Sequence, residues 1–360
     1  MPHVAWAYPS GAGSFPVWTV PALIFGAALA VALRAAAWFT RLLEDLGDHW
    51  DLSPGLLSFI SALGANVPNY AASLVAFASG QARVGLGIIV GSNLYNLTII
   101  LGLVTFAAPG GRGITLALRE LRDARRVAWL VAAMGVTTWL SVRLFTSSAP
   151  WPVSLVPNAA PLVSLLTVGL FLGLLFHALQ RLPHVSSQYV APQPTPTSTA
   201  DASPSSTARL APSAAPTIVG CVFALSLTLS GVIIMVQAGQ VVGRDVQLPP
   251  ALLGLVVLAV ATSLPNTVVA YQLARTARAA TSVEEILNSN GINLALGSAL
   301  PALLWSDRVA DPSLLRADLP LLSVLGLVVV ALLHARRIPR LIGTGLLGIY
   351  ALWVLAHILT

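Results

Sequence analysis

The chain carries one polar stretch twice, first as Ala65-Asn66-Val67-Pro68-Asn69 with Ser92-Asn93-Leu94-Tyr95-Asn96, and then as Thr262-Ser263-Leu264-Pro265-Asn266 with Ser289-Asn290-Gly291-Ile292-Asn293. From proline to serine is 24 residues in both copies, and from the asparagine after the proline to the last asparagine is 27. A constant offset of 197 therefore superimposes the two copies. This repetition of polar residues inside apolar segments indicates an internal duplication.

The composition around these stretches predicts an integral membrane protein. Of 360 residues, 56% are hydrophobic and only 9% are charged, and the mean hydropathy is +0.82. A soluble domain of this length could not bury so much apolar surface. The basic residues behind the net charge of +6 are scattered over short connections, which argues against nucleic acid as a partner. The single cysteine, Cys221, excludes a disulfide framework and a multi-cysteine metal site.

Apolar run length predicts an all-α protein with ten transmembrane helices. About 20 apolar residues span a bilayer as a helix. The predicted spans are 17–38, 54–79, 85–108, 127–146, 160–181, 216–240, 250–274, 285–305, 318–335 and 340–359. The two polar stretches fall in the second and third spans and in the seventh and eighth, so that the repeats cover about 54–108 and about 250–305.

A linker divides these spans into two halves. Residues 183–215 are rich in Pro, Ser, Thr and Ala and have no apolar period. They separate a first five-helix half, 1–182, from a second, 216–360. Since five is odd, consecutive halves must enter the membrane in opposite senses, and the sequence predicts inverted repeats.

The distribution of arginine predicts the orientation in a cell membrane. Fourteen of the 19 arginines fall in or beside the connections on the linker's side, and five on the other side. Basic residues favour cytoplasmic connections. The linker is therefore predicted to be cytoplasmic and both termini outside.

Helix breaks and shared helix faces predict one binding site. Four pairs are each four residues apart and so share a helix face: Ala65 with Asn69, Ser92 with Asn96, Thr262 with Asn266, and Ser289 with Asn293. Proline removes a helical hydrogen bond and displaces the carbonyl four residues before it, so breaks are expected at Gly64, Pro68 and Pro265. Freed carbonyls beside amides and hydroxyls suit hard cations, and broken helices near the midplane are typical of secondary transporters. The candidate ion or substrate ligands are Asn66, Asn69, Ser92, Asn93, Asn96, Thr262, Ser263, Asn266, Ser289, Asn290 and Asn293. The alternative for each is helix packing, in which small and amide residues are common.

The two copies resemble the alpha repeats of the cation/calcium exchanger superfamily, the sodium/calcium exchangers and their prokaryotic relatives. In that family each repeat is similar to Gly-Thr-Ser-x-Pro-Glu followed by Gly-Ser-Asn-x-x-Asn, or a variant ending in Asp. The first copy here begins at Gly64 and the second at Ala261. The resemblance covers most of the chain and implies an alternating-access antiporter, with calcium as substrate and sodium or protons as counter-ion. It implies no cofactor besides the transported cations. It also implies that membrane lipid surrounds the protein.

The chain departs from the family where the family's charge lies. The acid after each proline is replaced by Asn69 and Asn266, Asn293 stands where many relatives have Asp, and Ala65 replaces a hydroxyl. A divalent ion leaving water normally needs carboxylates. Neutral oxygens are therefore expected to hold calcium weakly and to favour a monovalent ion, and Asn does not titrate near neutral pH.

Other acids stand near the spans, but all are expected at membrane boundaries. Asp48 and Asp51 precede the second span, and Glu284 and Glu285 begin the eighth. Acids at helix starts are favoured by the helix dipole and are expected to be solvated there. Glu285 lies four residues before Ser289 and so shares its helix face.

Three functions remain open at this point. The first is a cation antiporter with altered or weakened calcium transport. The second is a transport-inactive relative that acts as a membrane scaffold or partner subunit, and the third a transporter of a non-calcium solute. No nucleophile elbow, phosphate loop or histidine cluster is present, so an enzyme is not predicted.

Overall fold

The computed structural model describes residues 16–50, 54–116, 118–146, 159–180, 215–275, 279–305 and 314–359. These residues are almost entirely helical, with π-helical turns, labelled η, inserted in several helices. The first half contains α1 (Thr19–His49), α2 (Pro54–Ala65), α3 (Val67–Ala78), α4 (Ala82–Tyr95), η1 (Asn96–Ile100), α5 (Leu101–Ala107), β1 (Ile114–Thr115), α6 (Leu118–Thr146) and α7 (Ala159–Leu179). The predicted linker lies outside the described residues, apart from its last position.

The second half begins with α8 and repeats much of this order. It contains α8 (Ala215–Asp245), α9 (Pro250–Leu252), η3 (Leu253–Leu258), α10 (Ala259–Arg275), α11 (Ala279–Ile292), η4 (Asn293–Ala299), α12 (Leu300–Leu304), η6 (Leu314–Asp318), α13 (Leu319–His334), β2 (Arg337–Ile338) and α14 (Arg340–Leu359). The sequence offset of 197 also relates elements. It carries the start of α4 at Ala82 onto that of α11 at Ala279, and the start of η1 at Asn96 onto that of η4 at Asn293.

Eight helical segments in the described part of the chain are long and apolar enough to cross a membrane. The two predicted spans outside this set are 54–79 and 285–305. The first is interrupted, since α2 ends at Ala65 and α3 begins at Val67. The second contains the polar residues from Glu285 to Asn293. Both are segments that carry the repeated motif.

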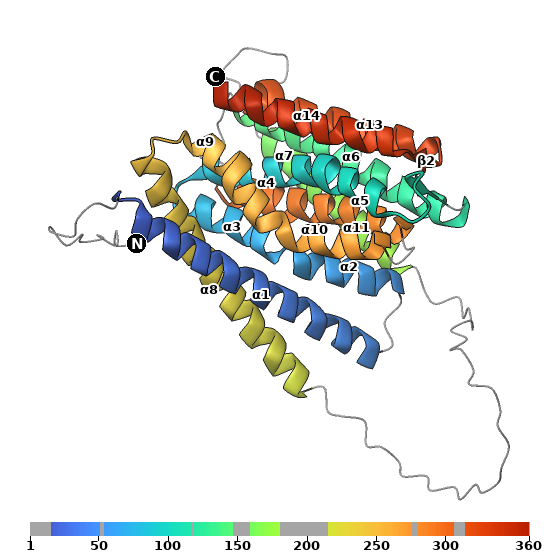
Figure 1. The fold of residues 1–360 in the computed structure, drawn as a ribbon, viewed down its shortest axis with the longest axis horizontal. Coiled ribbons are helices and arrows are strands. Elements are labelled where there is room, and N and C mark those ends of the chain that lie inside the picture. Colours follow the sequence, from blue (N-terminus) through green and yellow to red (C-terminus); the bar gives the residue numbers. More distant parts are fainter. Residues whose placement is uncertain are drawn as a thin grey trace, which may run out of the picture.

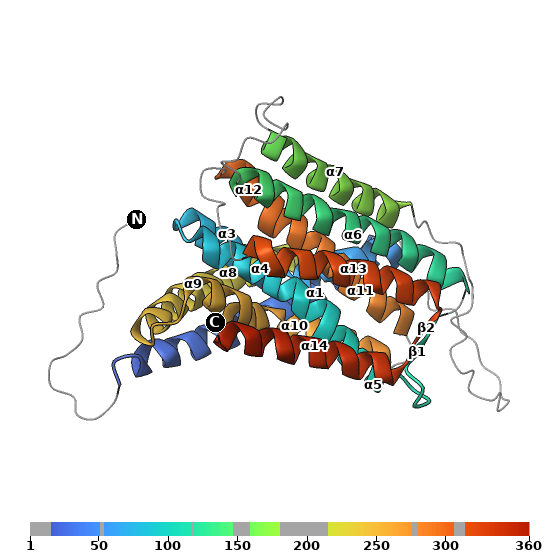
Figure 2. The same ribbon diagram turned by 90° about the horizontal axis from the view of Figure 1, so that it is seen from above.

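The helices form two packed groups. Long α1 and α8 lie side by side along one flank of the molecule, where they cross α3 (Figure 1). The larger core gathers α4, α5, α6, α11 and α13 (Figure 2). A short antiparallel ladder pairs β1 with β2, Ile114 opposite Ile338, and so ties the α5–α6 connection to the α13–α14 connection. The motif helix α4 contributes residues to both groups, and α11 belongs to the larger core.

Only one of the two expected proline breaks is present. Pro68 occupies the first turn of α3, where its missing amide hydrogen is not required, and the chain turns just before it at Asn66. Helix α10, in contrast, runs without interruption from Ala259 to Arg275 with Pro265 inside it. The predicted break at Pro265 is therefore not found. A proline is tolerated in a membrane helix when its neighbours satisfy the freed groups.

Two glycines allow α4 to cross η3 at backbone contact distance. A Cβ added to Gly91 would overlap the carbonyl oxygen of Leu255, and one added to Gly254 would overlap the carbonyl oxygen of Val84. Close backbone approach through small residues is the usual way in which membrane helices gain packing energy. These contacts fix the depth at which α4 presents Ser92 and Asn93 to the second half.

Substitution of Gly91 by alanine is expected to destabilise the fold. The added methyl group meets backbone atoms, which cannot rotate away, and overpacking of this kind costs about 1–3 kcal/mol or more. Thermal unfolding of the detergent-purified protein measures the effect. Gly348→Ala is the matched control, because nothing lies within 4 Å of a Cβ at Gly348 and alanine is the better helix former by about 1 kcal/mol. Equal melting temperatures for the two variants would contradict the close α4–η3 crossing.

Candidate ion-binding site

All eleven predicted ligand residues are buried in the middle of the helices. Each is at most 1% exposed, and they come from the α2–α3 junction, α3, α4, η1, α10, α11 and η4. Buried polar groups must hydrogen-bond with one another when neither water nor lipid offers a partner. Two side-chain networks meet most of this demand, one centred on Asn66 and one on the Asn93–Asn290 pair.

Asn66 is the centre of the first network. It sits in the turn between α2 and α3, where the helix is interrupted, and its side chain reaches both halves of the protein. Its Oδ1 accepts hydrogen bonds from Asn69 Nδ2 at 3.1 Å and from Asn266 Nδ2 at 2.7 Å. Its Nδ2 donates to Ala62 O at 2.7 Å and to Ser289 Oγ at 2.8 Å. The two asparagines that follow the repeated prolines are thus bound to the same oxygen.

The second network is reciprocal between the two copies. Asn96 Nδ2 donates to Asn290 Oδ1 at 2.8 Å, and Asn293 Nδ2 donates to Asn93 Oδ1 at 3.1 Å. Longer contacts join Asn290 Nδ2 to Asn93 O at 3.3 Å and Asn93 Nδ2 to Asn290 O at 3.5 Å. The offset of 197 carries Asn96 onto Asn293 and Asn93 onto Asn290, so the two bonds of each pair are equivalent to each other. Two equivalent surfaces that meet in this way are isologous, as in a two-fold dimer.

Two predicted ligands take no part in these networks. The Thr262 hydroxyl donates back into its own helix, to Leu258 O at 2.7 Å, which is the ordinary behaviour of threonine in a helix. Ser263 Oγ is buried and has no hydrogen-bond partner. Ser92 lies at the edge of the first network, with a long contact of 3.3 Å to Asn69 Oδ1.

Several oxygens at the site are buried with no hydrogen-bond partner. Besides Ser263 Oγ, they are the side-chain carbonyl oxygens Asn96 Oδ1, Asn266 Oδ1 and Asn293 Oδ1. Amide and hydroxyl oxygens are hard ligands that suit sodium or calcium. No three His, Cys, Asp or Glu side chains among the described residues gather as they would around a resident metal ion. The site thus offers mainly neutral oxygens.

Three features of the site were not predicted from the sequence. The π-helical turns η1 and η4 begin at the equivalent residues Asn96 and Asn293, and π-turns are frequent at functional sites. A serine hydroxyl also joins the two motif helices of each copy. Ser73 of α3 donates to Gly85 O of α4 at 3.0 Å, and Ser282 of α11 donates to Ala270 O of α10 at 2.7 Å. The offset of 197 carries Ser73 onto Ala270 and Gly85 onto Ser282, so these bonds join equivalent positions with the donor on opposite helices. Because the serine is not repeated at either position, the sequence repeat did not indicate these bonds.

The third unpredicted feature is the burial of Glu285. Glu285 is 2% exposed and Glu284 is 8% exposed, so the prediction of solvated acids at this helix start is wrong for both. The reason is that α11 begins at Ala279, six residues before the predicted span, and its first turns are covered by neighbouring helices. Glu285 therefore lies well inside the helix.

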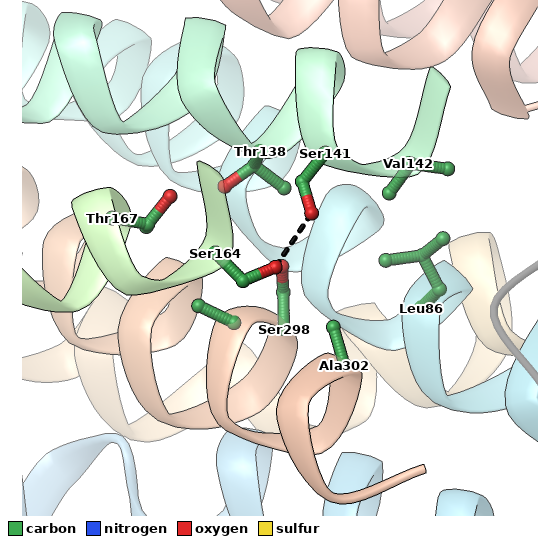
Figure 3. A pocket seen from close by; sticks show the side chains of 9 residues that line it. Leu86, Thr138, Ser141, Val142, Ser164, Thr167, Ser298 and Ala302 are labelled. Atoms are coloured by element: carbon green, nitrogen blue, oxygen red, sulfur yellow. Dashed lines mark hydrogen bonds between the residues drawn. The ribbon is translucent and has the colours of Figure 1, made fainter. Parts of the chain in front are cut away.

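A small hydroxyl-lined cavity lies beside the site, between α4, α6, α7 and η4. Its polar lining is Thr138, Ser141, Ser164, Thr167 and Ser298. Figure 3 shows Ser141 and Ser164 facing each other across it, with their hydroxyls 2.6 Å apart, and Thr138 Oγ1 has no hydrogen-bond partner. The cavity has room for about one water molecule. It extends the polar interior from η4 toward α6 and α7.

Comparison with known proteins places the chain in a family. The model of the sodium/calcium exchanger protein family matches residues 20–180 and 217–359, which is most of both halves. The chain belongs to the sodium/calcium exchanger family. Members of this family are transporters and not enzymes, and the chain is accordingly a multi-pass membrane protein.

Two curated relatives match a part of this exchanger-family chain. The putative antiporter CaxA of Alkalimonas amylolytica is 33% identical over 97 residues, and the inner membrane protein YrbG of Escherichia coli K12 is 31% identical over 121 residues. These matches cover 30% and 37% of the relatives' own lengths. The chain thus aligns with about a third of each.

Two solved structures share the fold over nearly the whole chain. The structure of native YfkE matches 94% of this chain and 93% of its own, with a TM-score of 0.65 and 16% identity. The sodium-calcium exchanger NCX_Mj matches 93% of this chain and 98% of its own, with a TM-score of 0.60 and 16% identity. At this identity the likeness shows an exchanger-type fold, and the binding residues must be judged from this chain's own geometry.

Removal of the Asn66 side chain is expected to destabilise this exchanger-family protein. Asn66→Ala takes the acceptor from Asn69 and Asn266 together, and each buried donor left without a partner costs about 1–3 kcal/mol. Ser263→Ala is the matched control at the equivalent position of the second copy, since Ser263 Oγ has no partner to lose. Thermal unfolding in detergent is expected to show a loss of several degrees for Asn66→Ala and little change for Ser263→Ala. Similar melting temperatures would contradict the central role of Asn66.

Proposed function

We propose that the protein is a secondary-active cation antiporter of the sodium/calcium exchanger type that works by alternating access. The observation that carries this proposal is the convergence of both motif copies on one buried, oxygen-rich site between the two halves. Unpartnered oxygens on Asn96, Asn266 and Asn293 leave ligands available to an ion. Small inorganic cations are therefore the proposed substrates.

The proposed membrane arrangement is ten spans in two inverted five-helix repeats. The recurrence of elements and hydrogen bonds at an offset of 197 supports two equivalent halves. Reciprocal contacts between the halves fit a two-fold axis lying in the membrane plane, as in other transporters with inverted repeats. Together with the arginine bias, this arrangement puts the linker in the cytoplasm and both termini outside.

The amides at the two motif positions favour a change of substrate. Calcium would have to exchange its hydration shell for neutral oxygens at Asn69 and Asn266, at a desolvation cost that carboxylates normally offset. A monovalent ion loses much less hydration free energy on entering the site, so neutral oxygens can offset it. We therefore propose weak calcium transport and preferential handling of a monovalent cation such as sodium. The motif asparagines do not titrate near neutral pH and so cannot couple transport to proton movement.

One observation favours a second candidate, a transport-inactive scaffold or partner subunit. Asn69 and Asn266 direct their amide groups onto the same oxygen of Asn66. The site thus satisfies much of its own hydrogen bonding without an ion. A neutral site of this kind also suits a non-calcium solute, although no residue of the site specifies one.

Fluxes in proteoliposomes distinguish these functions. Radiolabelled sodium is expected to enter vesicles that contain the wild-type protein by exchange with internal sodium, and radiolabelled calcium to enter weakly under an outward sodium gradient. The double variant Asn69→Glu, Asn266→Glu restores the two charges and is expected to raise the calcium flux at least about tenfold, equivalent to about 1.4 kcal/mol.

The matched control is Asn69→Gln, Asn266→Gln, which has the size of the glutamate variant without its charge. Its calcium flux is expected to stay at the wild-type level. Strong sodium-driven calcium uptake by the wild type would refute the argument from charge. Absence of flux for every cation, in vesicles shown to contain folded protein, would favour the scaffold function.

A further inference from the structure

Among the described residues, an acidic side chain is hydrogen-bonded to the asparagine site. Glu285 lies in α11, is 2% exposed, and accepts a hydrogen bond from Ser289 Oγ at 3.1 Å through its Oε1. Ser289 Oγ in turn accepts from Asn66 Nδ2 at 2.8 Å. The carboxylate is therefore within about 6 Å of the central amide, the range over which a charge acts strongly on another.

The remaining interactions of this carboxylate do not balance its charge. Glu285 Oε2 is buried without a hydrogen-bond partner, and no ion pair joins Glu285 to a basic side chain among the described residues. A buried carboxylate with one neutral hydrogen bond is costly, since its lost hydration is not replaced. A cation at the site would supply the missing partner.

The carboxyl group is present in one copy of the repeat only. The offset of 197 places Ile88, which is fully buried, at the position of Glu285 in the first copy. Glu285 also lies one helical turn before Ser289, away from the proline motif and from the last asparagine. It therefore occupies a different place from Asn69, Asn266 and Asn293, where the family's acids would stand.

We propose that Glu285 supplies the negative charge of the cation site in place of the motif acids, and that this one charge selects a monovalent cation of the size of sodium. The inference rests on the proposed function and names its substrate class. One carboxylate neutralises one positive charge; a divalent ion would keep an unbalanced charge in a poorly hydrated interior. The Asn side-chain oxygens without a hydrogen-bond partner would add neutral ligands to this charge.

Equilibrium binding of radiolabelled sodium to the detergent-purified full chain, at fixed pH, tests this without requiring transport. Glu285→Gln keeps the size and the hydrogen bond to Ser289 but removes the charge, and is expected to weaken sodium binding at least about tenfold. Glu284→Gln is the matched control, because Glu284 points about 100° away around the helix. It is expected to bind sodium as the wild type does.

A charge-transfer variant separates a binding role from a structural one. Asn266→Asp combined with Glu285→Gln returns one charge to the site from α10, while Asn66 Oδ1 keeps its donor Asn69, and it is expected to recover sodium binding. Asn266→Asp alone gives the site two charges and is expected to gain calcium binding that the wild type lacks. This single variant keeps the test decisive if Glu285→Gln does not fold.

The outcomes separate the two proposals. Sodium binding by the wild type with equal binding by folded Glu285→Gln would overturn the role of Glu285 and leave the antiporter proposal standing. The role of Glu285 is equally overturned if Asn266→Asp is folded and gains no calcium binding, or if the charge-transfer variant does not recover sodium binding. A wild-type protein that neither binds nor transports a cation would overturn both proposals.

Discussion

The structure depends on the demand that polar groups buried among membrane helices find partners in the protein itself. Asn66 meets that demand for several groups at once. Its one carbonyl oxygen receives amide donors from α3 and from α10, and its own amide reaches Ser289 on α11. Because these partners belong to different halves of the chain, the hydrogen bonds specify how the halves meet as well as stabilising the centre.

The same demand accounts for the local irregularities of the helices. The α2–α3 interruption turns Asn66 toward the second half, and the π-turns that begin at Asn96 and Asn293 occur where the helices carry cross-linked asparagines. Gly91 and Gly254 bring α4 and η3 to backbone contact, so that these short side chains can reach one another. Regular helices with larger residues would hold the two copies too far apart for direct amide bonds.

The repeated motif of this chain differs in charge from the exchanger motif that it resembles. Both residues after the repeated prolines are amides, yet the interior is not free of acids, because Glu285 contacts Ser289 from one turn earlier in α11. Glu285 belongs to the second copy alone, since Ile88 is its equivalent in the first. The number of charges near the ligands, more than the fold, then decides which ions the site can hold.

The sequence by itself determined the membrane class, the duplication and the identity of the buried polar residues, because composition and a constant offset of 197 are properties of the chain alone. It also predicted the break before Pro68, since proline at the start of a helix acts locally. Only the tertiary structure decided that Pro265 stays inside a helix, that Thr262 turns back on its own backbone and that Glu285 is buried. These outcomes depend on which helices cover a residue and which partners they bring, and neighbours distant in sequence leave no trace in a local pattern.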